Sequence, residues 1–219
     1  MAIKPTDHSP TQAPLGGSPA RLPRGRRAVA ICVVAFAYLY PFPYYQHLNN
    51  PNENVRLYMT AAIAEQGTYQ IDELRKRWGW VSDGAAHNGH YYSVKAPGMS
   101  LLGVPGYWLY HRTCKLFDKP VDQTIATWVC RVCAAILPTL LCLWLIYPWL
   151  ARQTISPVLR DATFISLALG SMLYGYGILF VSHTIAAMAG FSAFILLMSH
   201  RSGRPIPWWQ CGLAGMLAS

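Results

Sequence analysis

The chain has 219 residues, of which 53% are hydrophobic and only 12% charged, and its formal net charge is +9 at pH 7. Soluble proteins carry about 25% charged residues, so this composition leaves too little charged surface for a soluble globule. We therefore expect an integral membrane protein that contacts the lipid bilayer. The positive charge raises nucleic-acid binding as an alternative, but arginines crowd just ahead of the first apolar run, where the positive-inside rule expects them. No nucleic-acid partner is predicted. These arginines are Arg21, Arg24, Arg26 and Arg27.

Residues 1–27 are rich in Pro, Gly, Ser and Thr and lack apolar periodicity, which predicts a disordered cytoplasmic tail. The apolar run 28–45 is long enough to cross a bilayer and lacks a small-x-small cleavage signature, so we interpret it as an uncleaved anchor. Tyr44 and Tyr45 mark its exit as interfacial aromatics. Further spans are predicted at 124–149, 162–181 and 183–199.

A last apolar segment starts at Trp208 and is interrupted by the end of the chain at Ser219. Twelve helical residues cover only about 18 Å of a roughly 30 Å hydrocarbon core. We therefore expect the 219 residues to be the N-terminal portion of a longer protein, with an incomplete transmembrane domain over 28–219.

Residues 96–111 are apolar but hold two prolines and three glycines, and their usable length reaches only about 22 Å. Two topologies compete. If the segment spans the membrane, the two short basic loops that follow it face outside; Arg152 and Arg160 belong to the first loop. If it lies at the interface or dips in and returns, both loops lie inside with the basic tail, as the positive-inside rule requires. We adopt the second topology, in which residues 46–123 form one large extracytoplasmic loop.

Residues 51–66 of this loop are predicted to form an amphipathic helix at the membrane interface. Asn50 as N-cap, Pro51 at the first position and Glu53 make a capping-box variant, which is the structural alternative to any chemical role for Glu53. Gly67 is a natural end for the helix. The apolar face holds Val55, Met59, Ala62 and Ile63, and the other face holds Glu53, Arg56 and Thr60.

Asn88-Gly89 is the strongest short hairpin signal in the chain, so the residues on either side are predicted to pair as two strands. His87 and His90 then face each other across the turn. Metal binding by these histidines with Asp83 is conceivable, but no fourth ligand stands at a suitable local spacing. We predict no metal site and no cofactor. The sequence leaves open whether activity depends on a divalent metal ion, since no compact cluster of carboxylates marks a cation site.

The six cysteines do not predict a disulfide framework. Cys32, Cys130, Cys133 and Cys142 lie inside apolar runs. The C-x-x-C spacing of Cys130 and Cys133 has no second Cys or His pair at zinc-finger spacing. We interpret these cysteines as small apolar packing residues.

Three stretches resemble one family, and they occur in the family's order. "PNENVRLYMTAAIAEQGTYQID" and "NGHYYSVKAPGMSLLGVP" resemble the first extracytoplasmic loop of GT-C glycosyltransferases, especially the bacterial branch similar to protein O-mannosyltransferases and aminoarabinose transferases of lipid A. "GYGILFVSHTIAAMAGF", residues 175–191, resembles the second short outer loop. The resemblance runs from about residue 28 to the end of the chain.

The resemblance implies an all-α polytopic protein of the bacterial inner membrane with a cytoplasmic N-terminus. It also implies sugar transfer from a polyprenyl-phosphate-linked donor to a hydroxyl of a glycan, lipid or protein acceptor at the outer face. An inverting transfer needs a carboxylate that accepts the proton of the acceptor, a cation at the donor phosphate and an apolar groove for the lipid.

In the family's pattern Glu53 is the candidate base, and Lys95, in a K-x-P setting, is the candidate ligand of the donor phosphate. Arg131, near the outer end of the next span, is a second phosphate ligand, since an arginine at that depth is costly unless it faces an anion or a polar cavity. Anchoring of tyrosines at the interface, and capping or packing by His183, are the structural alternatives. The implied substrate pocket holds Arg56, His90, Tyr91, Tyr92 and His183.

The chain departs from the family in two ways. Relatives often carry an acidic residue just before the motif's lysine, where this chain has Val94. Family members are also more than twice this length, so we expect the 219 residues alone to be inactive. The sequence leaves two other classes open: a non-catalytic membrane protein that binds or transports a lipid-linked sugar, and a structural membrane subunit without a ligand.

Overall fold

The computed structural model describes residues 24–41, 50–153, 156–198 and 206–218. Helices make up most of this length, and the described part has one two-stranded sheet. In chain order the elements are α1 (Arg24–Leu39), α2 (Pro51–Gln66), α3 (Asp72–Trp78), β1 (Gly84–His87), β2 (His90–Ser93), α4 (Gly98–Leu116), α5 (Gln123–Arg131), the π-helical turn η2 (Val132–Ile136), α6 (Leu137–Gln153), α7 (Pro157–Leu169), α8 (Met172–Gly177), α9 (Ser182–Met198) and α10 (Trp208–Ala218).

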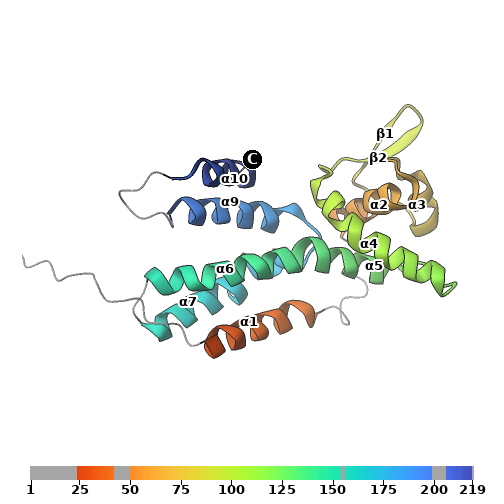
Figure 1. Cartoon of the computed structure of the whole chain (residues 1–219). Helices are drawn as coiled ribbons and strands as arrows, with labels where there is room; N and C mark the ends of the chain where they lie inside the picture. Colours follow the sequence, from red (N-terminus) through yellow and green to blue (C-terminus); the bar gives the residue numbers. More distant parts are fainter. Residues whose placement is uncertain (1–23, 42–49, 154–155, 199–205, 219) are drawn as a thin grey trace, which may run out of the picture.

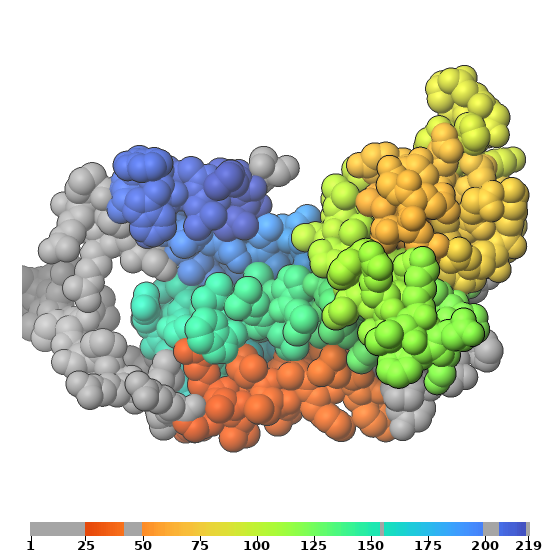
Figure 2. All heavy atoms as spheres, turned by 45° about the vertical axis from the view of Figure 1, so that its right-hand side comes forward, coloured from red at the N-terminus to blue at the C-terminus, as the bar shows by residue number. Residues whose placement is uncertain are grey.

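The elements form two packed groups that meet end to end (Figure 1). The first, which we call the bundle, contains α1, α6, α7, α9 and α10; the second, which we call the end cluster, contains α2, α3, the hairpin, α4 and α5. Each group has its own apolar core, with Tyr38, Tyr147 and Phe164 in the bundle and Tyr58 and Tyr107 in the end cluster. The space-filling outline is notched between α10 and the end cluster (Figure 2).

One helix runs from the end cluster into the bundle. α5, η2 and α6 are continuous over Gln123–Gln153, 31 residues, which contains the predicted span 124–149. In the described ranges this is the only helix long and apolar enough to cross a membrane; α9, where the span 183–199 was predicted, is a shorter apolar helix of 17 residues. The structure therefore confirms a mostly helical chain with a candidate membrane span and a small hairpin. The multi-pass arrangement stays a prediction.

The predicted span 162–181 is wrong as a single helix. α7 ends at Leu169, and Ser171 caps a separate short helix, α8, by accepting a hydrogen bond from Leu173 N–H at 3.1 Å. Hydropathy alone does not reveal this break, because the capping serine lies within an apolar run. The predicted loop with Arg152 and Arg160 is also wrong, since Arg152 lies in the last turn of α6 and Arg160 in α7.

The first helix begins earlier than predicted. α1 starts at Arg24, so residues 24–27 are helical and do not belong to the predicted disordered tail. The rest of that tail, residues 1–23, lies outside the described residues, as do Tyr44 and Tyr45 at the predicted exit of the span.

The two arginines at the start of α1 bind neighbouring helices. Arg26 Nη2 pairs with Asp161 Oδ2 of α7 at 2.9 Å. Arg27 Nη2 donates to the carbonyl oxygen of Trp144 in α6 at 2.7 Å. Pro148 has no N–H, so the Trp144 carbonyl one turn earlier lacks its helical donor, and Arg27 supplies one. These residues therefore join α1 to two other helices of the bundle.

α2 confirms the predicted helix 51–66 but not its predicted environment. Asn50 caps the helix by accepting from Asn52 N–H at 3.1 Å, and Gly67 ends it in the left-handed conformation at φ 68°. The residues from Val55 to Ala62 are all buried between α3, α4, α5 and the hairpin, so the helix does not present one face to an interface. Glu53, Arg56 and Thr60, on the face predicted to be polar, each make hydrogen bonds inside the protein, so this face can also be buried.

The predicted hairpin is confirmed. β1 and β2 pair antiparallel with His87 opposite His90. Asn88 and Gly89 both have positive φ, 50° and 80°, as a two-residue type I′ turn requires. The following apolar segment, predicted over 96–111, is a longer helix, α4, which packs on α2 and α5.

Three elements of the end cluster meet at Glu65 of α2. Arg77 of α3 holds both carboxylate oxygens at 2.9 and 2.8 Å, and the Tyr107 hydroxyl of α4 donates to Oε1. Burial alone would raise the pKa of Glu65, but the bonds from Arg77 and Tyr107 outweigh it and hold the pKa below its ordinary value. The ionised carboxylate is therefore the form that stabilises this corner.

Acid should weaken the end cluster through Glu65. A carboxylate with a depressed folded-state pKa stabilises the fold above its unfolded pKa, and this contribution is lost as the pH falls through the folded value. We expect Glu65→Gln to lower Tm at pH 7 and to approach the wild-type Tm below about pH 4, in thermal unfolding of the detergent-solubilised protein. The control is Glu73→Gln, which removes an exposed carboxylate that pairs with Lys76. Equal Tm values for wild type and Glu65→Gln at pH 7 would contradict this role.

A glycine in α4 allows the close approach of the continuous helix. A Cβ at Gly106 would lie 2.5 Å from Cys133 Sγ of η2, closer than real contacts allow. This contact agrees with the packing role predicted for Cys133. The two helices therefore fit only because one of them lacks a side chain here.

We expect Gly106→Ala to destabilise the protein by about 1–3 kcal/mol, because the extra methyl group overpacks a filled contact. The double variant Gly106→Ala/Cys133→Ala should recover part of this loss in the same denaturation experiment, since it removes the clashing sulfur. Gly190→Ala is the matched control, because nothing lies within 4 Å of its added Cβ. A Gly106→Ala variant as stable as wild type would show that the contact yields freely.

Candidate functional site

A buried ion pair joins the end cluster to the long helix. Arg131, at the end of α5, donates from Nε to Glu53 Oε1 at 2.8 Å and from Nη2 to Glu53 Oε2 at 2.7 Å. Glu53 lies in the first turn of α2 and is 1% exposed, and the Arg131 side chain is 10% exposed. The structure therefore brings together the predicted base and one predicted phosphate ligand.

The same carboxylate also binds the segment between α8 and α9. Phe180 N–H donates to Glu53 Oε1 at 2.6 Å. The Phe180 ring is fully buried and lies against α4, where a Cβ at Gly103 would come within 2.9 Å of it. Glu53 thus accepts three charge-assisted or backbone hydrogen bonds, and its carboxylate is committed to Arg131 and Phe180 rather than to the capping box predicted for it.

Arg56 lies one turn beyond Glu53 and is 6% exposed. Its Nη1 donates to the Asn52 carbonyl at 2.9 Å, while its Nε is buried and has no hydrogen-bond partner among the described residues. Burial lowers the pKa of Arg56 below its ordinary range, and the negative charges of Asp83 and Glu53 oppose this effect. The guanidinium stays charged at neutral pH, and its Nε–H could donate a hydrogen bond to an anion.

Hydroxyl groups from α2 and α4 bind the backbone carbonyl of Arg56. Thr60 Oγ1 and Ser100 Oγ both donate to the Arg56 carbonyl, at 2.8 and 3.0 Å. Thr60 Oγ1 also lies 3.2 Å from the Ser100 carbonyl oxygen. These contacts fix the start of α4 against α2, which explains how α4 and its preceding lysine are positioned.

Lys95 follows β2 and lies just before α4. It pairs there with the carboxylate of Asp83, the residue that precedes β1. Its Nζ lies 3.1 Å from Asp83 Oδ2, and both side chains are partly exposed, at 25% and 28%. Val94 N–H donates to the Asp83 carbonyl at 3.1 Å, which fixes the register of the two segments. Asp83 in turn interacts electrostatically with Arg56.

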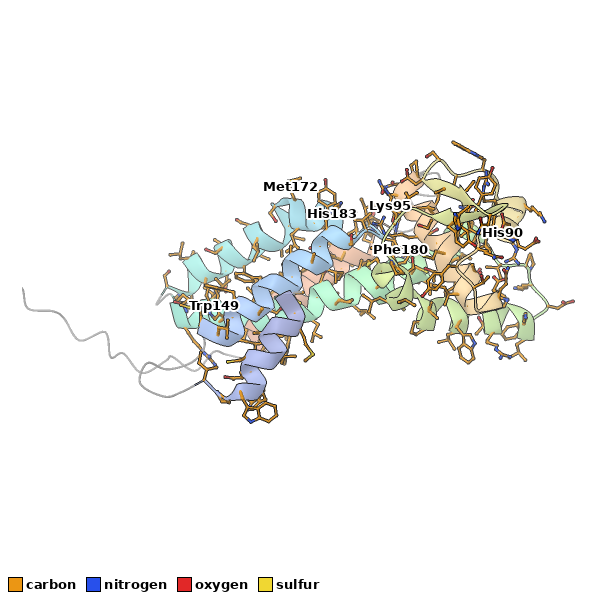
Figure 3. The ribbon with its side chains drawn as sticks, turned by 90° about the horizontal axis from the view of Figure 1, so that it is seen from above. His90, Lys95, Trp149, Met172, Phe180 and His183 are labelled. Carbon is orange, nitrogen blue, oxygen red and sulfur yellow. The ribbon has the colours of Figure 1, made fainter. Side chains whose placement is uncertain are left out.

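Five charged groups of the end cluster therefore alternate in sign, from Lys95 just before α4 to Arg131 at the end of α5. They are Lys95, Asp83, Arg56, Glu53 and Arg131, three cations against two carboxylates. Figure 3 shows Lys95 and Phe180 where the end cluster meets the bundle, His183 at the near end of α9 in the bundle, and His90 toward the far side of the end cluster. We call the five groups the junction site.

Other predicted pocket residues lie elsewhere. His90 Nδ1 pairs with Asp72 Oδ2 at 3.0 Å beside a shallow polar pocket, and the Tyr91 ring stacks under Arg75 at 3.5 Å. These partners hold the hairpin on α3.

Two predicted pocket residues make aromatic or amide contacts of their own. The Tyr92 hydroxyl lies 3.4 Å from Gln70 Nε2. His183, at the start of α9, is exposed and meets the Tyr176 ring edge-on at 5.4 Å. It lies three residues beyond Phe180, whose backbone N–H binds Glu53.

The residues described by the structure contain no group of three or more His, Cys, Asp and Glu that could hold a metal ion. Asp83, His87 and His90, which the sequence placed near one turn, have separate neighbours in Lys95, Tyr92 and Asp72. The chemistry available at the junction site is therefore that of carboxylates, guanidinium groups and an ammonium group.

Comparison of the chain with models of protein families, with curated proteins and with solved structures gives no match. The junction site and the loop motifs are therefore the features of the chain that bear on its function.

The sequence did not predict that Asp83 pairs with Lys95. It also did not predict that the backbone N–H of Phe180 binds Glu53. The hairpin register could have revealed Asp83, since the residue before β1 must lie near the residue after β2. No local signal points to Phe180, which is 127 residues from Glu53 and binds it through its backbone.

Breaking the buried pair between Glu53 and Arg131 should strongly lower the free energy of unfolding of the protein. Removing one partner leaves an uncompensated buried charge, so Arg131→Met should cost about 3–5 kcal/mol in the free energy of unfolding, measured with denaturant in detergent micelles. The double variant Arg131→Met/Glu53→Gln should recover part of that cost because it also removes the stranded charge. Arg112→Met, which changes an arginine over the exposed Trp108, is the matched control. Similar losses in the control and in Arg131→Met would contradict the importance of the pair.

Proposed function

We propose that this protein is a membrane glycosyltransferase of the GT-C type, which transfers a sugar from a polyprenyl-phosphate-linked donor to an acceptor hydroxyl. The observation that carries the proposal is the junction site, where residues from two separate motifs of the resemblance converge around an excess of cationic groups. Glu53 and Arg56 come from the first motif, and Lys95 comes from the second.

A phosphate anion fits this charge distribution. Three cations face two carboxylates, so one negative charge is still needed for local neutrality. The buried Nε of Arg56 offers a donor, and Lys95 is exposed enough to exchange Asp83 for a ligand oxygen. Cationic groups at a leaving phosphate stabilise the charge that develops there as the bond to the sugar breaks.

The surroundings suit a lipid-linked substrate. α4 carries exposed apolar side chains along the same stretch that follows Lys95, among them Leu101, Leu102, Trp108 and Leu109. The candidate membrane span begins at Gln123, and Arg131 lies in its first third, so the junction site would lie toward one membrane surface. We accordingly propose a multi-pass protein of the bacterial inner membrane whose junction site faces the outer side.

Binding or transport of a lipid-linked sugar without transfer is the second candidate. It is favoured by the burial of Glu53, whose two oxygens are both occupied and whose exposed fraction is 1%. A general base must reach the proton that it removes. On this reading the cations bind the phosphate and Glu53 only holds Arg131 in place.

The decisive experiment measures transfer of a radiolabelled sugar from polyprenyl phosphate, and binding of polyprenyl phosphate itself, with the product of the protein's own gene in proteoliposomes. Lys95→Ala should weaken polyprenyl-phosphate binding at least about tenfold, because a charge-assisted contact contributes about 1.5–3 kcal/mol. Lys119→Ala, which changes an exposed lysine beyond α4, is the control and should bind as wild type does.

Three outcomes separate the candidates. Transfer by wild type together with weaker binding by Lys95→Ala supports the glycosyltransferase. Binding without transfer supports the second candidate. If wild type neither binds polyprenyl phosphate nor transfers the sugar, the protein is better described as a structural membrane subunit.

A further inference from the structure

The base of an inverting transfer must meet the acceptor hydroxyl directly, and this requirement excludes one of the two carboxylates of the junction site. Glu53 is 1% exposed, and its oxygens are filled by Arg131 and Phe180. An acceptor could reach it only after the pair that joins the end cluster to the long helix had opened. That opening would leave two charges unpaired in a buried place, which costs several kcal/mol.

Asp83 meets the requirement that Glu53 fails. Its side chain is 28% exposed, and among the described residues only Lys95 holds its carboxylate, through Oδ2. Its backbone carbonyl is tied to Val94 N–H, so the side chain is carried on a fixed strand end rather than on a free loop. Arg56 lies within electrostatic reach on the buried side. Asp83 is thus the carboxylate of the junction site that solvent and substrate can both approach.

We propose that Asp83 is the proton acceptor of this site and that Glu53 is a positioning residue that acts through Arg131. This inference rests on the proposed glycosyl transfer. Lys95 has two contacts in the cycle: it pairs with Asp83 in the free protein and moves to the donor phosphate when substrate binds. The movement frees the carboxylate for the acceptor at the moment when the phosphate is in place.

The step balances without a co-reactant. The acceptor oxygen forms a bond to the anomeric carbon of the sugar, and its proton passes to an Asp83 oxygen. The bond between the anomeric carbon and the phosphate oxygen breaks, and the electron pair leaves with the phosphate. The products are the glycoside and polyprenyl phosphate, whose charge Lys95 and Arg56 offset, and the neutral Asp83 later returns its proton to water.

The test compares Asp83→Asn with wild type in the radiolabelled transfer assay. General base catalysis contributes about 10²–10⁴-fold to a rate, so we expect kcat to fall at least about 100-fold while the KM for the donor stays within about threefold. Asp83→Glu should retain part of the activity, because it keeps a carboxylate. Asp118→Asn, an exposed acid outside the junction site, is the matched control and should keep full activity.

A pH profile distinguishes a base from a structural residue. The charged groups that face Asp83 are Lys95 and Arg56. If Asp83 is the base, the pH dependence of kcat should differ between wild type and Asp83→Asn, whose residual activity should lack the acid limb of the wild-type profile. Thermal unfolding of each variant shows whether the fold is retained.

The outcomes are distinct. A loss of kcat with unchanged donor KM, unchanged Tm and a missing acid limb supports Asp83 as the base. Wild-type activity in Asp83→Asn overturns this inference and leaves the glycosyltransferase proposal standing. Loss of donor binding and a fall in Tm in Asp83→Asn also overturn it, since they indicate a structural role. Absence of transfer by wild type overturns both this inference and the proposed function.

Discussion

The ion pair between Glu53 and Arg131 is the contact that holds α2 on the long helix, which runs from the end cluster into the bundle. It connects the first turn of α2 with the last turn of α5, and the added bond from Phe180 N–H brings in the segment before α9. Three parts of the chain that are far apart in sequence thus meet at one carboxylate. A charge in a region this buried is tolerated when it is paired and hydrogen-bonded, as both oxygens of Glu53 are. The pair consequently fixes α2 on the long helix, and with it the position of Arg56.

The same constraint explains the course of the long helix. Arg131 is the last residue of α5, and the backbone passes immediately into the π-helical turn η2 before α6 begins. A π-helical turn adds a residue to the helical repeat and changes which side chains face a neighbour, and such turns are often found at functional sites. η2 also carries Cys133 against Gly106 of α4. The helix is therefore held on two sides within a few residues, by an ion pair at Arg131 and by close packing at Cys133.

Local features of this fold could be predicted from the sequence, and the distant contacts could not. The cap, the proline and the final glycine define α2, and Asn88-Gly89 defines the hairpin, because those residues act on backbone within a few positions. The environment of α2 was missed because its polar face is matched by residues up to 127 positions away. Apolar character alone suggested one span over 162–181, whereas Ser171 makes two helices of it. For the site, the loop motifs indicated Glu53, Arg56 and Lys95, and the depth of Arg131 in an apolar run indicated that residue, but hairpin register was needed to place Asp83 beside Lys95.

The junction site separates two tasks that one carboxylate cannot perform together. A carboxylate that holds a buried arginine must keep both oxygens in fixed hydrogen bonds, and each of those bonds stabilises its charged form and shields it from substrate. A carboxylate that takes a proton from a substrate must be open to the solvent and bound loosely enough to exchange partners. Glu53 has the first set of properties and Asp83 has the second. Because Arg56 lies between them and interacts with both, the rigid pair can set the position of the cationic surface while the exposed pair exchanges partners on it. Glu53, Arg56 and Arg131 are buried, whereas the side chains of Asp83 and Lys95 are partly exposed, at 28% and 25%. The five charges therefore run from the fixed interior of the junction site to the part that a substrate would reach.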